Sequence, residues 1–370
     1  MSMRLEFVRL ASMPDANFQA ICTAYKISRK TGYKWLKRFA EEGESGLSDR
    51  SRRPHCSPAR SSDELESRIL RLHDEHDCWG SRKLQALLPR DGQLPHPSTI
   101  DAILRRHGRQ VRGSVKGQDA ATKRFEHAEP NVLWQMDFKG HFALSDKRAG
   151  RCHPLTVLDD HSRFSLCLAA CGNEQASTVK AALTKTFQRY GLPDRITADN
   201  GPPWGLPRGK GISTLEAWLI RLGIRVGHSR PYHPQTQGKD ERFHRTLKLE
   251  VISRRGFQSI TECQIAFDDW RELYNHVRPH GALNHDTPIS RYRRSGREFP
   301  AALPPVEYLP GDRILKVRGN GHVKIRKHEC FIGEGLIGHE IAIRPTAIDG
   351  IFKVYFCGAE IREIDMAEFG

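Results

Sequence analysis

Hydrophobic positions near the start of the chain recur at helical spacing, in two short segments separated by a turn. The pattern predicts helices over residues 18–25 and 29–39, with Ser28 as the N-cap of the second. In the second helix, Tyr33 and Leu36 belong to the expected apolar stripe. Two helices joined by a tight turn are typical of a helix-turn-helix.

Three further short helices are predicted after a segment rich in Ser, Gly, Pro and Arg, which we interpret as a linker over 45–62. Apolar positions again recur at helical spacing, and arginines follow the last helix. The predicted helices span 63–73, 81–88 and 98–107. We interpret them as a second helix-turn-helix, followed by a basic linker over 113–123.

The pattern changes to short strand-like runs from Asn131 onward. Four runs, at 132–138, 141–144, 155–158 and 164–170, predict an antiparallel meander. Helices and strands then alternate: a helix over 177–190, a strand over 195–199, a helix over 213–222, a strand over 224–228 and a helix from about Gly238. This order predicts an α/β domain with a mixed sheet.

The helix near Gly238 has two distinct faces and follows a loop stiffened by prolines. Its apolar stripe is Phe243, Leu247 and Val251, and its charged face is Glu241, Arg245 and Lys248. The helix therefore presents one carboxylate among cations. An ordinary amphipathic surface helix is the competing interpretation.

The last part of the chain follows a long predicted helix at 258–276 and a proline-rich linker. Its alternating runs at 322–326, 340–344 and 351–356, with glycines at the turns, predict a small antiparallel β-barrel. Candidate DNA contacts in this part are Lys324, Arg326 and Lys327. A purely structural cap is the competing interpretation.

The charge balance points to a partner. The 370 residues contain 59 Lys and Arg against 44 Asp and Glu, a formal net charge of +15, which attracts a protein to nucleic acid. Residues 1–60 alone carry 12 basic and 6 acidic side chains. The DNA contacts predicted here are Arg29, Lys30, Lys34, Lys37, Arg38, Arg52 and Arg53. A basic helical hairpin that touches no DNA is the alternative.

Other partners and compartments fit the sequence less well. No run of about 18 apolar residues occurs and the N-terminus lacks a signal-peptide core, so we expect a cytoplasmic protein without a membrane partner. The nine cysteines are odd in number and scattered, so we expect reduced thiols. His73, His76 and Cys78 lack a fourth ligand at finger-like spacing, so we do not expect zinc.

Three acidic residues stand out by their positions. Asp137 falls within the first strand of the α/β domain, Asp199 ends a later strand, and Glu241 lies early in the helix near Gly238. A strand interior is a costly place for an aspartate unless it is paired or binds a metal ion. If the two strands are neighbours, Asp137 and Asp199 meet at one edge of the sheet, and the helix can bring Glu241 over them.

These acids lie in motifs that resemble the catalytic core of retroviral integrases and bacterial insertion-sequence transposases of the DDE type. The motifs are Trp134-x-x-Asp137, Thr197-Ala198-Asp199-Asn200-Gly201 and Pro231-x-x-Pro-Gln-x-Gln-Gly-x-x-Glu241. The resemblance covers residues 126–293. It implies a ribonuclease-H-like fold in which Asp137, Asp199 and Glu241 hold two divalent ions, Mg²⁺ or Mn²⁺.

The same resemblance implies an activity. The protein would bind the ends of a mobile element, cleave the 3′ strands by metal-dependent hydrolysis and join them to target DNA by transesterification. Hard oxygen ligands and two metal ions suit this chemistry, which requires no nucleophilic side chain. Joining two ends requires two active sites, so we expect a homodimer or larger assembly on double-stranded DNA. A catalytically silent DNA-binding regulator derived from a transposase and a structure-selective nuclease on the same fold are the alternatives.

One departure from the family pattern concerns spacing. Asp199 and Glu241 are 42 positions apart, more than is usual in integrases, and a loop at 202–211 accounts for the excess. Asp159 and Asp160 close the run at 155–158 and are not expected to be ligands. We assign Lys239, Arg242 and Arg245 to phosphate contact, with a solvated charged face as the alternative.

We therefore expect a multidomain α and α/β protein. Its parts are a helix-turn-helix at 1–60, a second helix-turn-helix at 61–124, a ribonuclease-H-like mixed-sheet catalytic core at 125–295, and a small β-barrel at 306–370.

Overall fold

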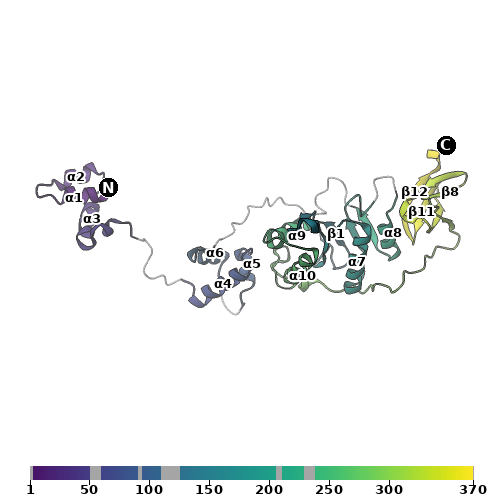
Figure 1. Ribbon diagram of the computed structural model, residues 1–370, viewed down its shortest axis with the longest axis horizontal. Helices are drawn as coiled ribbons and strands as arrows, with labels where there is room; N and C mark the ends of the chain where they lie inside the picture. The colour runs from purple at the N-terminus through teal and green to yellow at the C-terminus, as the bar shows by residue number, and fades with distance from the viewer. Residues whose placement is uncertain are drawn as a thin grey trace. The chain divides into compact units, whose positions relative to one another are not determined.

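The computed structural model describes residues 3–50, 60–90, 94–109, 126–205, 211–228 and 238–369. The chain divides into two compact units, Met1–Ser62 and Asp63–Gly370, and each is described by itself (Figure 1). Two of the predicted DNA contacts, Arg52 and Arg53, lie outside the described residues, as does most of the Pro231 motif.

The N-terminal unit packs three helices around a small aromatic core. They are α1 (Met3–Ala11), α2 (Phe18–Ala24) and α3 (Arg29–Glu42), followed by the 3₁₀ turn η1 (Gly43–Leu47). Ser28 caps α3 as predicted, since its side chain accepts a hydrogen bond from the Thr31 amide at 3.1 Å. The helix-turn-helix predicted for α2 and α3 is therefore observed, with one additional helix before it.

The additional helix changes which face of α3 is buried. Tyr33, predicted to lie in the apolar stripe, is 55% exposed and stacks on Phe18 with 4.3 Å between ring centroids. Trp35 is buried instead, edge-to-face with Phe7 of α1 at 5.4 Å. The prediction for Tyr33 was wrong because α1 covers a side of α3 that the pattern left open.

Residues 63–109 form a second helical core. Its helices are α4 (Asp63–Glu75), α5 (Ser81–Ala86) and α6 (Pro97–Arg106), packed around Ile69, Leu84, Ile100 and Ile103. One charged group lies within it: Glu66 is buried and accepts hydrogen bonds from Arg106 and from His107 at 2.9 Å. Because a buried carboxylate is costly without partners, this network ties α4 to the end of α6.

A six-stranded mixed sheet forms the centre of the larger unit (Figure 1). Its strands are β1 (Trp134–Phe138), β2 (Phe142–Ala143), β3 (Arg151–Asp159), β4 (Ser165–Cys171), β5 (Arg195–Ala198) and β6 (Arg225–His228). The order is β2-β3-β1-β5-β6, with β4 also paired to β3. The mixed sheet is as predicted. A simple meander is not observed, because β1 pairs with β3 rather than with β2.

Helices cover both faces of this sheet. On one face lie α7 (Ala176–Tyr190) and α8 (Thr214–Arg221), which share a core with Trp134 and Met136. On the other lie α9 (Gly238–Leu247), the π turn η3 (Lys248–Ile252) and α10 (Ile260–His276). Short 3₁₀ turns occur at Lys147–Ala149, Gly281–Leu283 and Pro288–Arg291. None of the described helices combines the length and apolarity needed to cross a membrane.

His280 should make this unit sensitive to acid. Burial, and next the positive charges of Arg278, Lys83 and Arg163, lower the pKa of His280 to about 3. The unfolded chain binds a proton near pH 6.5 and the folded chain does not, so stability falls as the pH drops below 6.5. We expect this one group to cost about 2 kcal/mol between pH 6.5 and 5.

The measurement is the apparent Tm from pH 8 to pH 5 for the wild type and His280→Gln. Glutamine stays neutral and can still donate to the carbonyl oxygen of Tyr274, which His280 Nε2 contacts at 3.3 Å. The variant should lose less stability on acidification. Equal pH slopes would contradict the assignment.

The C-terminal strands form two separate sheets. A four-stranded antiparallel sheet has the order β12-β11-β10-β7, and β8 pairs only with β9. The bounds are β7 (Arg313–Lys316), β8 (His322–Ile325), β9 (His328–Phe331), β10 (Glu340–Pro345), β11 (Ile351–Phe356) and β12 (Ala359–Asp365), with 3₁₀ turns at Glu334–Leu336 (η6) and Met366–Phe369 (η7). The predicted closed barrel is not observed in the described residues, because β7 and β12 end the larger sheet as unpaired edges.

Candidate active site

Asp137 projects from the sheet face that α9 covers. Side chains alternate along β1, so Trp134 and Met136 enter the core beneath α7 while Asp137 points to the opposite face. On the neighbouring strand, Thr156 lies opposite Asp137, and its hydroxyl donates to the Asp137 carbonyl oxygen at 3.0 Å. The main chain at Asp137 is therefore fixed from β3.

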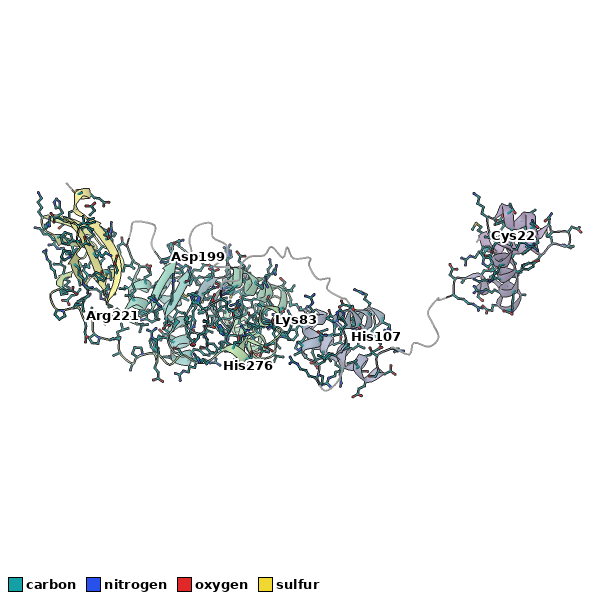
Figure 2. All side chains as sticks on the ribbon, turned by 180° about the vertical axis from the view of Figure 1, so that it is seen from behind. Cys22, Lys83, His107, Asp199, Arg221 and His276 are labelled. Atoms are coloured by element: carbon teal, nitrogen blue, oxygen red, sulfur yellow. The ribbon has the colours of Figure 1, made fainter. Side chains whose placement is uncertain are left out.

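Asp199 (Figure 2) follows the carboxyl end of β5, the strand next to β1 in the sheet. The strands β1 and β5 are parallel, with Gln135 opposite Thr197. Asp137 and Asp199 each follow these partners by two residues, so they stand at the same level along the sheet. The strand adjacency on which the expectation from the sequence depended is thus observed. The proximity of the two acids depends on strand order rather than on any local sequence pattern.

The two carboxylates repel each other. Burial, and next the negative charge of Asp199, raise the pKa of Asp137 to about 7. Burial also raises the pKa of Asp199, and the positive charge of His228 opposes that increase. Two neighbouring acids that are hard to ionise together form a natural binding site for a hard cation, which removes the repulsion.

The first turn of α9 places two adjacent acids differently. Asp240 is buried, at 3% exposure, and no described residue donates a hydrogen bond to its Oδ1 atom. Burial, and next the charges of Asp137, Asp160 and Asp199, raise its pKa well above the usual range. Glu241, the predicted third acid, is exposed. Asp240 was missed from the sequence because both acids are polar and periodicity did not distinguish them.

Glu241 is instead a helical neighbour of a histidine that reaches Asp137. It precedes His244 by three residues, so the two side chains are neighbours on the helix surface. His244 lies 3.9 Å from Asp137 Oδ2, measured from Nδ1, and 2.9 Å from the Thr156 hydroxyl, measured from Nε2. Burial, and next the charge of Lys139, lower the pKa of His244 to about 4, so the ring is neutral near pH 7. No sequence pattern singled out His244.

The acids that were not expected to be ligands have structural partners. Asp159 accepts hydrogen bonds from the amides of Asn131 and Ser162, each at 2.7 Å. Asp160 accepts one from Gln135 Nε2 at 2.9 Å and forms an ion pair with Lys239. Lys239, one of the predicted phosphate contacts, is therefore engaged within the protein.

The other predicted DNA contacts in the described part are mostly exposed. Exposed side chains are Arg29, Lys30, Lys34, Lys37, Arg242 and Arg245, and Arg38 is half-buried. Lys37 lies 3.8 Å from Glu41 of the same helix. An exposed ion pair of this kind is weak, so it leaves Lys37 available to a phosphate.

His228 and Glu216, which form a hydrogen-bonded pair next to the main chain of Asp199, were also missed from the sequence. His228 Nδ1 lies 2.9 Å from the Asp199 carbonyl oxygen, and Nε2 lies 2.7 Å from Glu216 Oε1. Both partners are acceptors, so the protonated ring can donate from both nitrogens, and this arrangement favours the charged form. The hydrogen bond to Glu216 is the main cause that raises the pKa of His228. Ser213-x-x-Glu216 was a visible capping-box signal in the sequence.

The donor chemistry fits a divalent cation only in part. Asp137 and Asp199 supply hard oxygen atoms at one edge of the sheet. Among the residues that the structure describes, no group of three or more His, Cys, Asp or Glu is arranged to hold a metal ion. Asp137 and Asp199 lie near each other because their strands are adjacent. Glu241 does not form a metal-binding group with them.

Family models match most of the chain. Those described as an integrase core domain match residues 127–234 and 222–288. A helix-turn-helix domain model matches 3–55, and a homeodomain-like domain model matches 31–104. Residues 312–369 match the C-terminal domain of the IS481 family transposases.

Two curated proteins illustrate these matches. The chain is 27% identical over 253 residues to the insertion element IS407 uncharacterized 31.7 kDa protein of Burkholderia multivorans, covering 67% of this chain and 88% of that protein. It is 26% identical over 247 residues to the insertion element IS476 uncharacterized 39.2 kDa protein of Xanthomonas euvesicatoria, covering 66% and 69%. Among solved structures, the HTLV-2 integrase catalytic core domain in complex with magnesium is 14% identical, covering 45% of this chain and 100% of that chain, with a TM-score of 0.35.

Proposed function

Because the chain belongs to the insertion-sequence transposases with an integrase core and helix-turn-helix domains, we propose that it cleaves and joins DNA at the ends of a mobile element. It hydrolyses the 3′ strands at the element ends and then joins them to target DNA by transesterification. The observation that carries this proposal is the placement of Asp137 and Asp199 at the same level near the carboxyl ends of adjacent parallel strands, within the segment matched as an integrase core.

In this proposal Asp137, Asp199 and Glu241 hold two Mg²⁺ or Mn²⁺ ions. Such ions activate the attacking oxygen and stabilise the leaving oxygen of an in-line displacement. The scaffold fixes the positions of these ligands. The strands β1 and β5 hold the two aspartates, and α9, which carries Glu241, packs on the sheet face to which Asp137 points. Arg242 and Arg245, exposed on the same helix, contact the DNA backbone near the scissile phosphate.

The helix-turn-helix units recognise the element ends, and the excess of basic residues holds the duplex. Joining two ends requires two active sites, so the working form is a homodimer or a larger assembly on DNA. The proposal places this assembly on DNA in the bacterial cytoplasm. The C-terminal sheets add a further DNA or subunit contact, and a barrel closed on binding is part of this proposal.

The direct test uses the purified full chain, Mg²⁺, a labelled duplex that carries the element end and a supercoiled target plasmid. We expect cleavage at the 3′ end of the element followed by joined products. One observation favours a second candidate, a silent DNA-binding regulator: Glu241 is exposed and not gathered with the aspartates. Specific end binding without cleavage in Mg²⁺ or Mn²⁺ would support the regulator.

Cations on α3 should control the salt dependence of end binding. Arg29→Ala and Lys34→Ala each remove an exposed cation from the helix that we assign to DNA reading. We expect weaker binding, with the slope of log K against log salt reduced by about 1 for each phosphate that the protein no longer neutralises. Lys185→Ala, which removes an exposed cation from α7, is the control. Slopes that match the wild type would exclude α3 from phosphate contact.

A further inference from the structure

The main chain at Asp199 is held from the neighbouring strand. The strands β5 and β6 pair in parallel with Ala198 opposite His228, so the His228 ring reaches the residue just beyond β5. Its Nδ1 atom donates to the Asp199 carbonyl oxygen at 2.9 Å. Gly205 packs against the same ring, because a Cβ atom there would lie only 2.9 Å from Cε1. His228 is therefore confined between β5 and the loop that follows it.

Glu216 connects this histidine to the start of α8. Its Oε1 atom accepts from His228 Nε2 at 2.7 Å, and its Oε2 atom accepts from the Ser213 amide at 2.6 Å. Ser213 Oγ in turn donates to the Trp204 carbonyl oxygen at 3.0 Å. The loop after Asp199, the cap of α8 and the end of β6 thus share one hydrogen-bond network, and Glu216 is nearly buried within it.

The C-terminal region contacts the same cap. The Gly335 amide in η6 donates to the Ile212 carbonyl oxygen at 3.0 Å. A Cβ atom at Gly335 would lie 2.3 Å from the Ser213 carbonyl carbon, so only glycine permits this approach. Ala217 of α8 belongs to the C-terminal apolar core. Further along α8, Arg221 (Figure 2) donates to the Pro304 carbonyl oxygen at 2.9 Å.

We propose that His228 and Glu216 are positioning residues that fix Asp199, and that the C-terminal region steadies them by packing on residues 212–213. The inference rests on the proposed function, because the position of Asp199 matters for activity only if its carboxylate binds a metal ion. Groups that orient a metal ligand typically contribute about 10- to 100-fold to metal affinity. Loss of either residue should therefore weaken metal binding before it weakens DNA binding.

The first variant is Glu216→Gln, which preserves size but has one oxygen for two donors. If the glutamine oxygen faces His228, the hydrogen bond from the Ser213 amide is lost; if it faces Ser213, the bond between the charged ring and the carboxylate is replaced by a weaker neutral bond from the glutamine NH₂ to His228 Nε2. We expect about a tenfold rise in the Mn²⁺ concentration for half-maximal cleavage, a smaller change in kcat at saturating Mn²⁺, and the same loss in direct Mn²⁺ binding measured by electron paramagnetic resonance.

The matched control is Glu262→Gln. Glu262 also lies in the first turn of a helix and accepts from a backbone amide, that of Gln258, at 2.7 Å. It belongs to α10, on the sheet face opposite to α8. This variant should bind Mn²⁺ as the wild type does, which separates a defect in Asp199 from a general defect of helix capping.

Further variants test the histidine and the C-terminal contact of this network separately. His228→Ala removes both hydrogen bonds, whereas His228→Asn places an amide near the Nδ1 position and should recover part of the Mn²⁺ affinity. Gly335→Ala displaces η6 from Ser213 and should weaken Mn²⁺ binding measured in the absence of DNA. If Glu216→Gln does not fold, these variants still test whether the network positions Asp199.

The outcomes separate this inference from the proposed function. If Glu216→Gln and His228→Ala bind Mn²⁺ as the wild type does while Asp199→Asn does not, the positioning role is wrong and the metal site stands. If Asp137→Asn and Asp199→Asn also retain wild-type Mn²⁺ binding, the proposed function itself fails. Reduced Mn²⁺ affinity with recovery in His228→Asn supports the positioning role.

Discussion

Replacing Asp137 or Asp199 with asparagine should reduce strand cleavage and joining about 10³-fold or more, equivalent to about 4 kcal/mol of transition-state stabilisation. An amide has one oxygen and no charge, so it holds a divalent cation far less well than a carboxylate. End binding by the helix-turn-helix units should be unchanged. The measurement is single-turnover cleavage of an end duplex at saturating protein and Mg²⁺.

Asp137→Asn should fold as the wild type does, on electrostatic grounds. The pKa of Asp137 is about 7, so its neutral form is already well populated near neutral pH without metal, and the amide resembles that form. Asp269→Asn on α10, an exposed acid outside the proposed site, is the matched control and should keep full activity. Near-wild-type rates for both Asp137→Asn and Asp199→Asn would rule out the proposed metal site.

Glu241→Gln and Asp240→Asn should have very different effects, although the residues are adjacent. If Glu241 is the third ligand, its loss should cost about 10³-fold in cleavage, as for the aspartates. Asp240→Asn should change the rate by less than about tenfold, or about 1.4 kcal/mol. The two substitutions test different environments, because Asp240 is buried and Glu241 is exposed.

The metal-free stability of Asp240→Asn supplies an independent readout. Burial and neighbouring acids raise the folded-state pKa of Asp240, so its carboxyl costs stability increasingly as the pH rises above the unfolded pKa near 3.9. Asparagine removes this cost, and a gain of about 1 kcal/mol near pH 7.5 would raise the apparent Tm by about 2–4 °C. If Asp240→Asn abolishes cleavage while Glu241→Gln preserves it, Asp240 is the ligand on α9.

Periodicity was sufficient for the scaffold of the site. Phe243, Leu247 and Val251 are buried as the stripe of α9 predicted, because their spacing brings them onto one helix face. The strands that carry Asp137 and Asp199 were also located, since short apolar runs ended by Asp and Gly are local signals. Their side-by-side pairing was only a conditional expectation, because strand order depends on contacts between distant segments.

Features that depend on how elements pack were missed for the same reason. Asp240 and Glu241 are both acidic, and only the seating of α9 on the sheet decides which one is buried. The ring of His228 meets Glu216 because β6 ends beside α8, an arrangement without a local signature. The barrel was expected from alternation alone, but closure requires β7 and β12 to meet, and alternation does not specify partners.

The open edges of the C-terminal sheet bear on solubility. An unpaired edge strand exposes backbone groups that can recruit an edge from another molecule, and charged side chains discourage this. The edge strand β7 carries Arg313 and Lys316, and β12 carries Glu360, Arg362 and Glu363. Each edge thus bears charges that must be desolvated before another strand can add to it. These charges therefore disfavour the addition of the C-terminal sheet of one molecule to that of another in a continuous β-structure.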